Sequence, residues 1–290
     1  MKGRIINLVS GFYYVDTGSV YTCKLRGKVK NVRFPLVGDI AEISVISGNN
    51  AVIEDILPRK NEFIRPAVAN VDTIVFVASE TIPITDPFLI DRLSVIAAKQ
   101  DCGFILCINK KDLSDSERLF EIYKNCGFPV ICTSAETGEG ISNLKEAIAG
   151  KVCVLSGNSG VGKSSIINRL TDNESAEIGD VSLKLGRGKH KTRQVRLYSV
   201  SDRTFIADTP GFASFDISMV ADIKKEELQY EFPDFSDYVG KCRFSDCMHV
   251  GEPGCCVAEA VQAGNISQSR YDSYVKLYNV VSQHKDWENE

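Results

Sequence analysis

The sequence predicts a multidomain protein in which a small β-barrel precedes an α/β domain and a helical region that contains a cysteine cluster. Three observations predict this order. β-rich segments crowd residues 1–57, strands alternate with helices over residues 71–208, and a helical pattern follows. A chain of 290 residues is also too long for one small domain. We expect domains at residues 1–62, 63–215 and 216–290.

The first part of the chain alternates short β-rich runs with turns. Five closely spaced strands in so short a stretch fit a small barrel, with an oligonucleotide-binding (OB) fold as the leading option. An SH3-like barrel has nearly the same sequence signature. The segment from Pro58 to Pro66 is predicted to be a linker. The expected strands are residues 3–9, 12–18, 20–27, 38–46 and 50–57.

In the central part, strands alternate with helices, which predicts a parallel sheet covered on both faces. The helix at 86–100 has Asp86 as its N-cap. In the helix at 114–127, Ser114 and Glu117 have the spacing of a capping box. The other expected elements are strands at 72–79, 103–108, 129–132, 151–156, 195–200 and 204–208, helices at 142–150 and 163–171, and a loop at 172–194.

Beyond about residue 215 the sequence becomes helical. In the last of these helices, Tyr271, Tyr274, Tyr278 and Val281 recur at helical spacing. Such a stripe is typical of a helix face that packs against the rest of the protein. The expected helices are residues 224–232, 256–264 and 267–284.

Composition and charge narrow the class of protein. With 43% apolar and 25% charged residues, the chain can build folded cores. The net charge of −4 argues against indiscriminate nucleic-acid binding, yet residues 24–33 hold five Lys/Arg, residues 184–196 hold six, and neither block contains an acid. One such block can be a solvated loop; two favour a phosphate-rich partner. Since no export signal or membrane-spanning stretch is evident, we expect a cytoplasmic protein without a membrane partner.

Ten cysteines in a chain of this size favour reduced thiols and a metal site over a disulfide scaffold. Cys242, Cys247, His249 and Cys255 supply three sulfurs and one imidazole within a short segment, as a closed tetrahedral zinc site requires. Such a site is structural because all four ligands come from the protein. Cys256 competes with Cys255, but adjacent residues seldom point the same way. The alternative is a group of buried free cysteines, which the histidine inside the cluster makes weaker.

A phosphate-binding loop lies between the strand at 151–156 and the helix at 163–171. Its pattern is Gly157-x-x-x-x-Gly162-Lys163-Ser164. Glycines let backbone N–H groups surround a phosphate, the lysine reaches the outer phosphates, and the serine hydroxyl binds Mg²⁺. The candidate nucleotide-binding residues are Gly157, Asn158, Ser159, Gly160, Val161, Gly162, Lys163, Ser164 and Ser165.

A second motif names the base. Asn109-Lys110-Lys111-Asp112 resembles the NKxD box of GTPases, and it follows a strand where ligands bind in open α/β sheets. The aspartate carboxylate accepts hydrogen bonds from guanine N1–H and the exocyclic amine, whereas adenine presents an acceptor at N1. Ser134-Ala135 resembles the companion element whose backbone N–H reads guanine O6. Together the motifs predict guanine recognition by Asn109, Lys110, Asp112, Ser134 and Ala135.

The remaining GTPase elements follow the phosphate loop. Asp208-Thr209-Pro210-Gly211 resembles the DxxG element, in which the aspartate holds Mg²⁺ through water and the glycine N–H contacts the γ-phosphate. Thr192 is the candidate switch threonine over Mg²⁺. Phe212 stands where Ras-like proteins have a water-orienting glutamine. His190 is a candidate for positioning that water, with an RNA-contacting or solvated loop histidine as the alternative.

The order of these motifs is a cyclic rotation of the usual GTPase order. Binding loops at the carboxyl ends of parallel strands keep their places whichever connection is cut, so the pocket can survive the rotation. The chain leaves the α/β domain directly after the DxxG element. We therefore expect the C-terminal region to be tethered to the segment that contacts the γ-phosphate.

The combination of barrel, rotated GTPase motifs and Cys/His module resembles the circularly permuted, small ribosomal subunit-dependent GTPases of the RsgA (YjeQ/YloQ) family. This resemblance implies an OB-fold barrel, GTP and Mg²⁺ binding, one structural zinc, and hydrolysis of GTP to GDP stimulated by the 30S subunit late in its assembly. It implies 16S rRNA as a partner and a monomeric protein. It also implies that His190 corresponds to the histidine that is proposed, in this family, to replace the water-orienting glutamine of Ras-like proteins. The family commonly has His-Thr-Thr where this chain has His190-Lys191-Thr192.

Two other classes of function remain open at this stage. A small-molecule kinase would use the phosphate loop with ATP, and the Asn109–Asp112 box argues against it. A binding module with a vestigial nucleotide pocket is the other alternative. The presence of Lys163, Ser164 and Asp208 opposes that reading.

Overall fold

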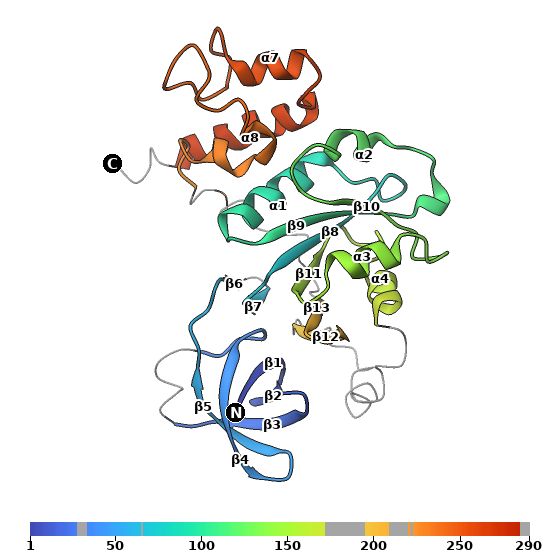
Figure 1. Ribbon diagram of the computed structural model, residues 1–290, viewed down its shortest axis with the longest axis vertical. Helices are drawn as coiled ribbons and strands as arrows, with labels where there is room; N and C mark the ends of the chain where they lie inside the picture. The colour runs from blue at the N-terminus through green and yellow to red at the C-terminus, as the bar shows by residue number, and fades with distance from the viewer. Residues whose placement is uncertain (28–33, 65, 172–194, 209–219, 221–222, 285–290) are drawn as a thin grey trace. The chain divides into compact units, whose positions relative to one another are not determined.

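A computed structural model describes residues 1–27, 34–64, 66–171, 195–208, 220 and 223–284 (Figure 1). The strands are β1 (Lys2–Val9), β2 (Phe12–Asp16), β3 (Val20–Leu25), β4 (Ile40–Ser47), β5 (Asn50–Ile56), β6 (Glu62–Ile64), β7 (Ala67–Ala69), β8 (Thr73–Ser79), β9 (Gly103–Asn109), β10 (Val130–Cys132), β11 (Val152–Ser156), β12 (Arg196–Ser201) and β13 (Thr204–Asp208). The helices are α1 (Pro87–Lys99), α2 (Arg118–Tyr123), α3 (Ile141–Ala147), α4 (Lys163–Leu170), α7 (Cys256–Gln262) and α8 (Gln268–His284), with 3₁₀-helices η2 (Lys111–Leu113), η5 (Leu228–Glu231) and η6 (Pro233–Phe235).

The chain forms two compact units. The first comprises Met1–Ile74, Ile141–Ser156 and Lys163–Phe212; the second comprises Val75–Gly140, Gly157–Gly162 and Ala213–Glu290. A closed barrel has the strand order β1-β2-β3-β5-β4, and a six-stranded sheet has the order β10-β9-β8-β11-β13-β12. No helix among the described residues combines the length and apolarity that crossing a membrane requires.

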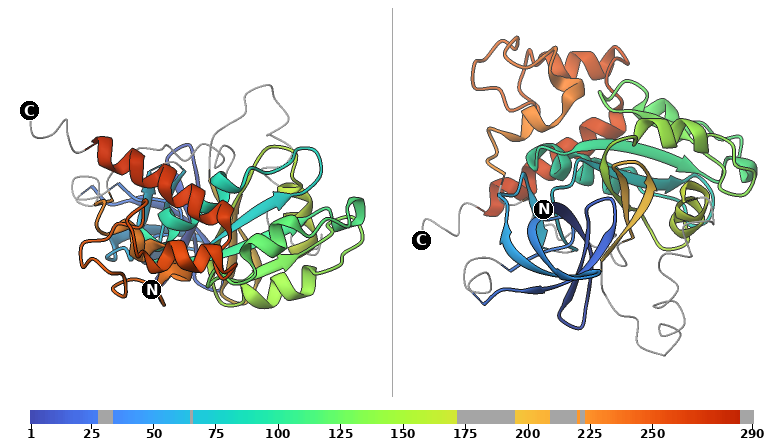
Figure 2. Two further views of the ribbon diagram at one scale, coloured as in Figure 1. Left: turned by 90° about the horizontal axis from the view of Figure 1, so that it is seen from above. Right: turned by 60° about the horizontal axis from the view of Figure 1, so that its bottom comes forward.

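The barrel belongs to the first unit and has the predicted OB-type architecture. β3 pairs with β5 in parallel, and β1 pairs with β4 in antiparallel fashion, so the sheet closes on itself. The right-hand view of Figure 2 shows the five strands curving around one another. Alternate residues of each strand point inward because side chains switch faces at every residue. The buried core consists of Ile5, Tyr13, Val15, Cys23, Ala41, Ile43, Ala51 and Ile53.

The segment after the barrel is more ordered than the expected linker. The Arg59 guanidinium donates to both carboxylate oxygens of Asp39, at 2.7 and 2.8 Å, and both side chains are buried. β6 and β7 then pair as a short antiparallel hairpin, and Val37 of the barrel region forms a parallel bridge with Val68. The prolines at 58 and 66 predicted a linker here, but the ion pair and the hairpin fix this segment to the barrel.

The first unit also contains three strands of the larger sheet. β11 and β13 are parallel, with Val154 opposite Ala207, while β12 and β13 form an antiparallel hairpin. The Arg4 guanidinium of β1 lies 5.8 Å from the centre of the Phe205 ring on β13. The hairpin therefore contacts both the barrel and the strand that leads into the phosphate loop.

In the second unit, α1 begins as the sequence predicts. The Asp86 side chain accepts a hydrogen bond from the Phe88 N–H at 3.0 Å. The capping box expected at Ser114 is wrong, because α2 begins only at Arg118 and the Ser114 hydroxyl accepts from the Ser116 N–H instead. The Leu119 N–H instead donates to a carboxylate oxygen of Glu80 at 2.7 Å, so a distant acid caps this helix.

The C-terminal part of the second unit differs from its helical prediction in one place. Residues 224–232 do not form an α-helix: only η5 lies within this range, and η6 follows it. Pro233 disfavours the helical conformation in the preceding residue, and Phe232 accordingly has φ −112° and ψ 94°. α7 and α8 form as expected and lie side by side in Figures 1 and 2.

α8 packs against α1, and a buried cation lies at this contact (Figure 1). Arg270 is fully buried and donates to Asp91 of α1 at 2.8 Å and to Asp234 of η6 at 2.7 Å. Its guanidinium also lies 4.5 Å from the centre of the Phe232 ring. The tyrosine stripe is confirmed only in part, because Tyr274 is fully buried while Tyr271 and Tyr278 are half-buried.

Candidate functional site

The phosphate loop connects β11 to α4, as the motif requires. Gly157 has φ +134°, and a Cβ there would lie 2.2 Å from the Val77 carbonyl oxygen. Gly162 has φ +101°, and its Cβ would lie 2.3 Å from Nδ2 of Asn109. The two motif glycines are therefore required by close packing as well as by backbone conformation. Asn158, Ser159, Gly160 and Val161 lie between them, and Lys163, Ser164 and Ser165 form the first turn of α4.

Asn109, at the end of β9, joins the phosphate loop to the predicted guanine-recognition elements. The residue is buried, with only 3% of its surface exposed. Nδ2 donates to the Val161 carbonyl at 2.9 Å, and Oδ1 accepts from the Ala135 N–H at 3.0 Å and from the Thr133 hydroxyl at 3.2 Å. Both ends of the amide are used, so the asparagine fixes three loops relative to one another within the second unit.

Asp112 is exposed and oriented by its neighbour. The Ser134 hydroxyl donates to its Oδ1 at 2.5 Å, and the same hydroxyl accepts from the Thr137 N–H at 3.1 Å. The carboxylate is thus held from one side, and the residue is otherwise exposed. Thr133 was not among the sequence candidates, although its place directly after β10 is a signal that could have found it.

The loop after β8 also reaches this site. Lys110 has a left-handed backbone, with φ +68°, and its Nζ donates to the Ile82 carbonyl at 2.8 Å. A Cβ on Gly160 would meet the Pro83 ring at 3.5 Å, so the same loop packs against the phosphate loop. Sequence reasoning missed Ile82 and Pro83 because no motif marks them.

Of the other predicted residues, the structure describes only the backbone position of Asp208. Asp208 is the last residue of β13, which runs parallel to β11, so it reaches the sheet edge from which the phosphate loop departs. His190, Thr192 and Gly211 lie outside the described residues. The candidate water-positioning and switch residues thus stay predictions.

The four predicted metal ligands lie together in the second unit. Their ligand atoms are all within 4.8 Å of one another, and the Nδ1 atom of His249 is 3.5, 3.5 and 3.3 Å from the sulfurs of Cys242, Cys247 and Cys255. Ligands at zinc–ligand distances near 2.0–2.3 Å in a tetrahedron are separated by about 3.5–3.8 Å. The donor set and its spacing therefore fit a tetrahedral metal ion. Cys256 lies outside this set, and its sulfur donates to the Lys241 carbonyl at 3.0 Å.

Burial shifts the pKa values of two cysteines and the histidine in this cluster. It raises the pKa of the Cys247 thiol to about 12 and raises the pKa of Cys255 as well. Burial also lowers the pKa of His249, which keeps the imidazole neutral. A metal ion binds thiolates and neutral imidazole, and its charge removes the protons from coordinating thiols. The histidine is thus ready for a metal, whereas the thiols ionise as the metal binds.

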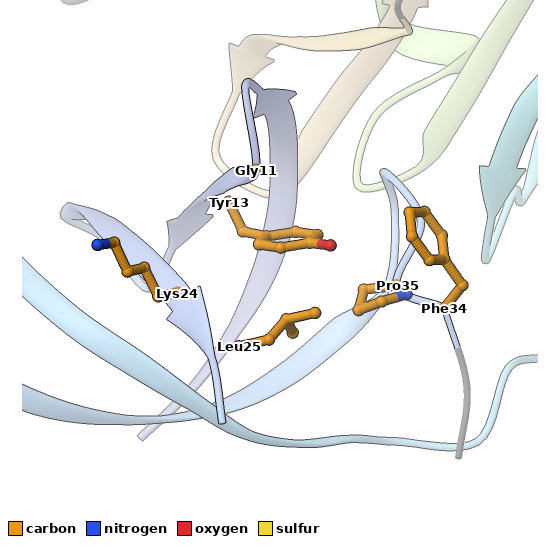
Figure 3. A pocket seen from close by; sticks show the side chains of 6 residues that line it. All are labelled: Gly11, Tyr13, Lys24, Leu25, Phe34 and Pro35. Carbon is orange, nitrogen blue, oxygen red and sulfur yellow. The ribbon is translucent and has the colours of Figure 1, made fainter. Parts of the chain in front are cut away.

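A pocket of about 440 Å³ opens on the barrel (Figure 3). Its lining combines aromatic, apolar and cationic groups and comes from the β1–β2 turn, β2, β3 and the segment before β4. The Phe34 side chain is 68% exposed, and Nζ of Lys24 lies 5.1 Å from the centre of the neighbouring Phe12 ring. In OB folds this face of strands two and three binds oligonucleotides. The lining residues are Gly11, Tyr13, Lys24, Leu25, Phe34 and Pro35.

The fold and the nucleotide motifs define a circularly permuted GTPase that carries an N-terminal barrel. The sequence matches the RsgA GTPase family over residues 56–218 and the RsgA N-terminal domain over residues 2–53. The chain therefore belongs to the RsgA GTPase family.

Curated relatives and solved structures agree with this assignment. The small ribosomal subunit biogenesis GTPase RsgA of Alkaliphilus metalliredigens is 41% identical, covering 98% of this chain and 99% of that protein. YjeQ from Thermotoga maritima superposes with a TM-score of 0.79 at 37% identity, covering 97% of this chain and 98% of that chain. YloQ, described as a circularly permuted GTPase, has a TM-score of 0.79 at 33% identity, covering 97% of this chain and 95% of that chain.

Proposed function

We propose that this protein is a Mg²⁺-dependent GTPase that binds the 30S ribosomal subunit late in its assembly and hydrolyses GTP to GDP and phosphate faster on the subunit. The observation that carries the proposal is the Asn109 network, which joins the phosphate loop to the guanine box although these motifs are rotated in sequence. The names of near full-length relatives support the ribosomal role.

The nucleotide-binding roles follow from the chemistry of each group. Asp112 reads guanine N1–H and the 2-amino group, and the Ala135 N–H reads O6. In the described geometry that N–H donates to Asn109, so O6 would share it. Lys163 neutralises charge on the outer phosphates, where charge grows as the terminal phosphoryl group leaves.

Mg²⁺ binding and catalysis complete the proposed site. A bound Mg²⁺ ion would offset the negative charge of the nucleotide phosphates. Ser164 and Thr192 would supply hydroxyl ligands to this ion, and Asp208 would act on it through water. Gly211 contacts the γ-phosphate through its N–H, and His190 positions the attacking water because Phe212 cannot hydrogen-bond to it.

The cluster of Cys242, Cys247, His249 and Cys255 is proposed to hold one structural zinc ion. Three sulfurs and one imidazole are the donors that Zn²⁺ accepts in closed sites. No position is left for a substrate, so the metal stabilises the fold of the C-terminal region. Metal analysis of purified protein should give close to one zinc per chain; a value near zero would contradict the assignment.

We assign RNA contacts to the barrel, residues 1–62, and to the C-terminal region, residues 216–290, on either side of a GTPase domain at 63–215. The barrel pocket offers an aromatic ring and a lysine, which suit unpaired bases and phosphates of 16S rRNA. The basic blocks at 24–33 and 184–196 add salt-sensitive phosphate contacts. The protein is proposed to act as a monomer, since one chain supplies every motif.

Nucleotide competition tests the enzymatic core of the proposal. Unlabelled GTP and GDP should displace a labelled guanine nucleotide, ATP should not, and the Lys163→Ala variant should lose hydrolysis. The Lys2→Ala variant serves as a control, because that lysine is 63% exposed on the barrel. Equal competition by ATP would favour a kinase-like protein, and unchanged hydrolysis in Lys163→Ala would remove the phosphate loop from the mechanism.

A further inference from the structure

Gln229 of η5 contacts the metal cluster from outside it. Its Oε1 lies 2.9 Å from Nε2 of His249, the ring nitrogen that faces away from the three sulfurs. Only 7% of Gln229 and 1% of His249 are exposed, so water does not compete effectively for this contact. Gln229 belongs to no motif in the sequence.

A second hydrogen bond fixes which end of the glutamine amide meets the imidazole. Its Nε2 donates to the Glu226 carbonyl at 3.0 Å, which a carbonyl oxygen could not do. The amide oxygen must therefore face His249. Because that oxygen can only accept, Nε2 of the imidazole carries the hydrogen. The lone pair of Nδ1 is then directed at the sulfurs, 3.3–3.5 Å away.

We propose that Gln229 is a positioning residue for the metal cluster. It holds His249 in the tautomer and ring orientation that a tetrahedral divalent ion such as Zn²⁺ requires at Nδ1. Metal-ligating histidines generally donate their other N–H to an acceptor of this kind, and losing that acceptor lowers metal affinity about 10- to 100-fold. The inference rests on the metal site in the proposed function, and it adds a group that is not itself a ligand.

The position of Gln229 connects the metal to the rest of the second unit. Glu227, two residues before Gln229, contacts α1: its carboxylate accepts a hydrogen bond from Nζ of Lys99 at 3.1 Å. On its aromatic sides, the His249 ring lies 6.3 Å from Phe235 and 6.4 Å from Tyr274, centre to centre. On the side of the ring away from the sulfurs, the glutamine thus supplies the polar contact beside the aromatic side chains.

Two substitutions separate hydrogen bonding from packing. Gln229→Leu keeps similar bulk without an acceptor, whereas Gln229→Glu keeps an acceptor for the imidazole N–H. Zn²⁺ affinity would be measured on the full chain by competition with a chromogenic chelator, with Gln262→Leu on the exposed end of α7 as a control. We expect Gln229→Leu to lose about 10- to 100-fold in affinity. Gln229→Glu, which keeps the acceptor but loses the donor to the Glu226 carbonyl, should lose less, and the control should stay near wild type. Equal losses in both Gln229 variants would show a packing role and overturn the proposal.

A measurement on the unmodified protein covers the case in which a variant fails to fold. Long-range ¹H–¹⁵N correlation of the zinc-loaded wild type should show His249 protonated at Nε2 and metal-bound at Nδ1. The opposite tautomer, or wild-type affinity in Gln229→Leu, would overturn the proposal. If wild-type protein binds neither Zn²⁺ nor Co²⁺, the metal assignment itself fails, which is a separate result.

Discussion

At the scale of single residues, a polar group is free to bind a base only if the protein has not already used its hydrogen bonds. Both the amino group and the oxygen of the Asn109 amide hydrogen-bond within the protein, to Val161, Ala135 and Thr133. Asp112 has one carboxylate oxygen held by Ser134 and is otherwise exposed. Asn109 therefore holds the loops together, and we expect Asp112 to be the residue that selects the base.

Replacing that carboxylate should change the preferred nucleotide. Asp112→Asn loses an acceptor for the guanine 2-amino group, and hydrogen bonds to a charged group contribute about 1.5–3 kcal/mol each. We expect GTP affinity to fall by about 3 kcal/mol, or roughly 150-fold. Xanthine carries an oxygen where guanine has the amine, so the variant should gain affinity for xanthosine triphosphate. Asp115→Asn, at a nearby exposed acid, is the control.

Isothermal titration with both nucleotides would measure this switch. A variant that loses both nucleotides equally would show that Asp112 supports the loop and does not read the base.

A methyl group at Gly162 should damage the site through Asn109. The new Cβ would lie 2.3 Å from the Asn109 amide nitrogen, which must move and release the Val161 carbonyl. A lost buried hydrogen bond costs about 1–3 kcal/mol, so GTP affinity should fall about 5- to 150-fold. Gly150→Ala is a matched control, because Gly150 has φ +71° with nothing within 4 Å of its Cβ. Equal effects in the two variants would assign the loss to backbone strain alone.

His190 is the residue whose role the sequence alone suggests. We expect His190→Ala to lower the subunit-stimulated turnover of GTP far more than GTP affinity, because a group that positions water acts on the reaction step. Turnover and equilibrium binding would be measured on the same preparation. An equal loss in both quantities would indicate a binding role.

At the scale of elements, the contact between α1 and α8 depends on a buried charge. Arg270→Ala leaves Asp91 buried without its cation, and breaking a buried pair from one side costs about 3–5 kcal/mol. Lys2→Ala removes an exposed pair with Glu42 and should cost less than about 1 kcal/mol. Urea denaturation followed by circular dichroism would compare the two. A similar, small loss in both variants would mean that aromatic packing alone holds α8.

Elements were predictable where local chemistry decides them. Asp86 caps α1 through its own side chain, and sequence spacing was enough to find it. The start of α2 was not, because its cap is Glu80, which follows a different strand. Residues 224–232 had helical periodicity, but Pro233 and the contacts of η5 changed their conformation. Arg270 could not be predicted as buried, since arginines are mostly exposed and its partners are distant in sequence.

At the scale of the whole molecule, the motifs predicted candidate nucleotide-binding residues but not the residues that contact and support them. The phosphate loop and the guanine box are contiguous patterns, each with a local chemical requirement. Thr133, Pro83 and Gln229 contribute through three-dimensional contacts, and a single sequence carries no signal of those. The rotated order did not hide the site, because strand ends define it whichever loop is cut.

GTP turnover with and without purified 30S subunits, at low salt, tests the central claim most directly. Low salt preserves the phosphate contacts through which we expect the protein to bind rRNA. Turnover should rise when subunits are added, and the rise should disappear in Lys163→Ala. Lys124→Ala, at an exposed lysine directly after α2 and outside the assigned RNA-contact regions, should retain it. The same turnover in both conditions would contradict a subunit-dependent GTPase.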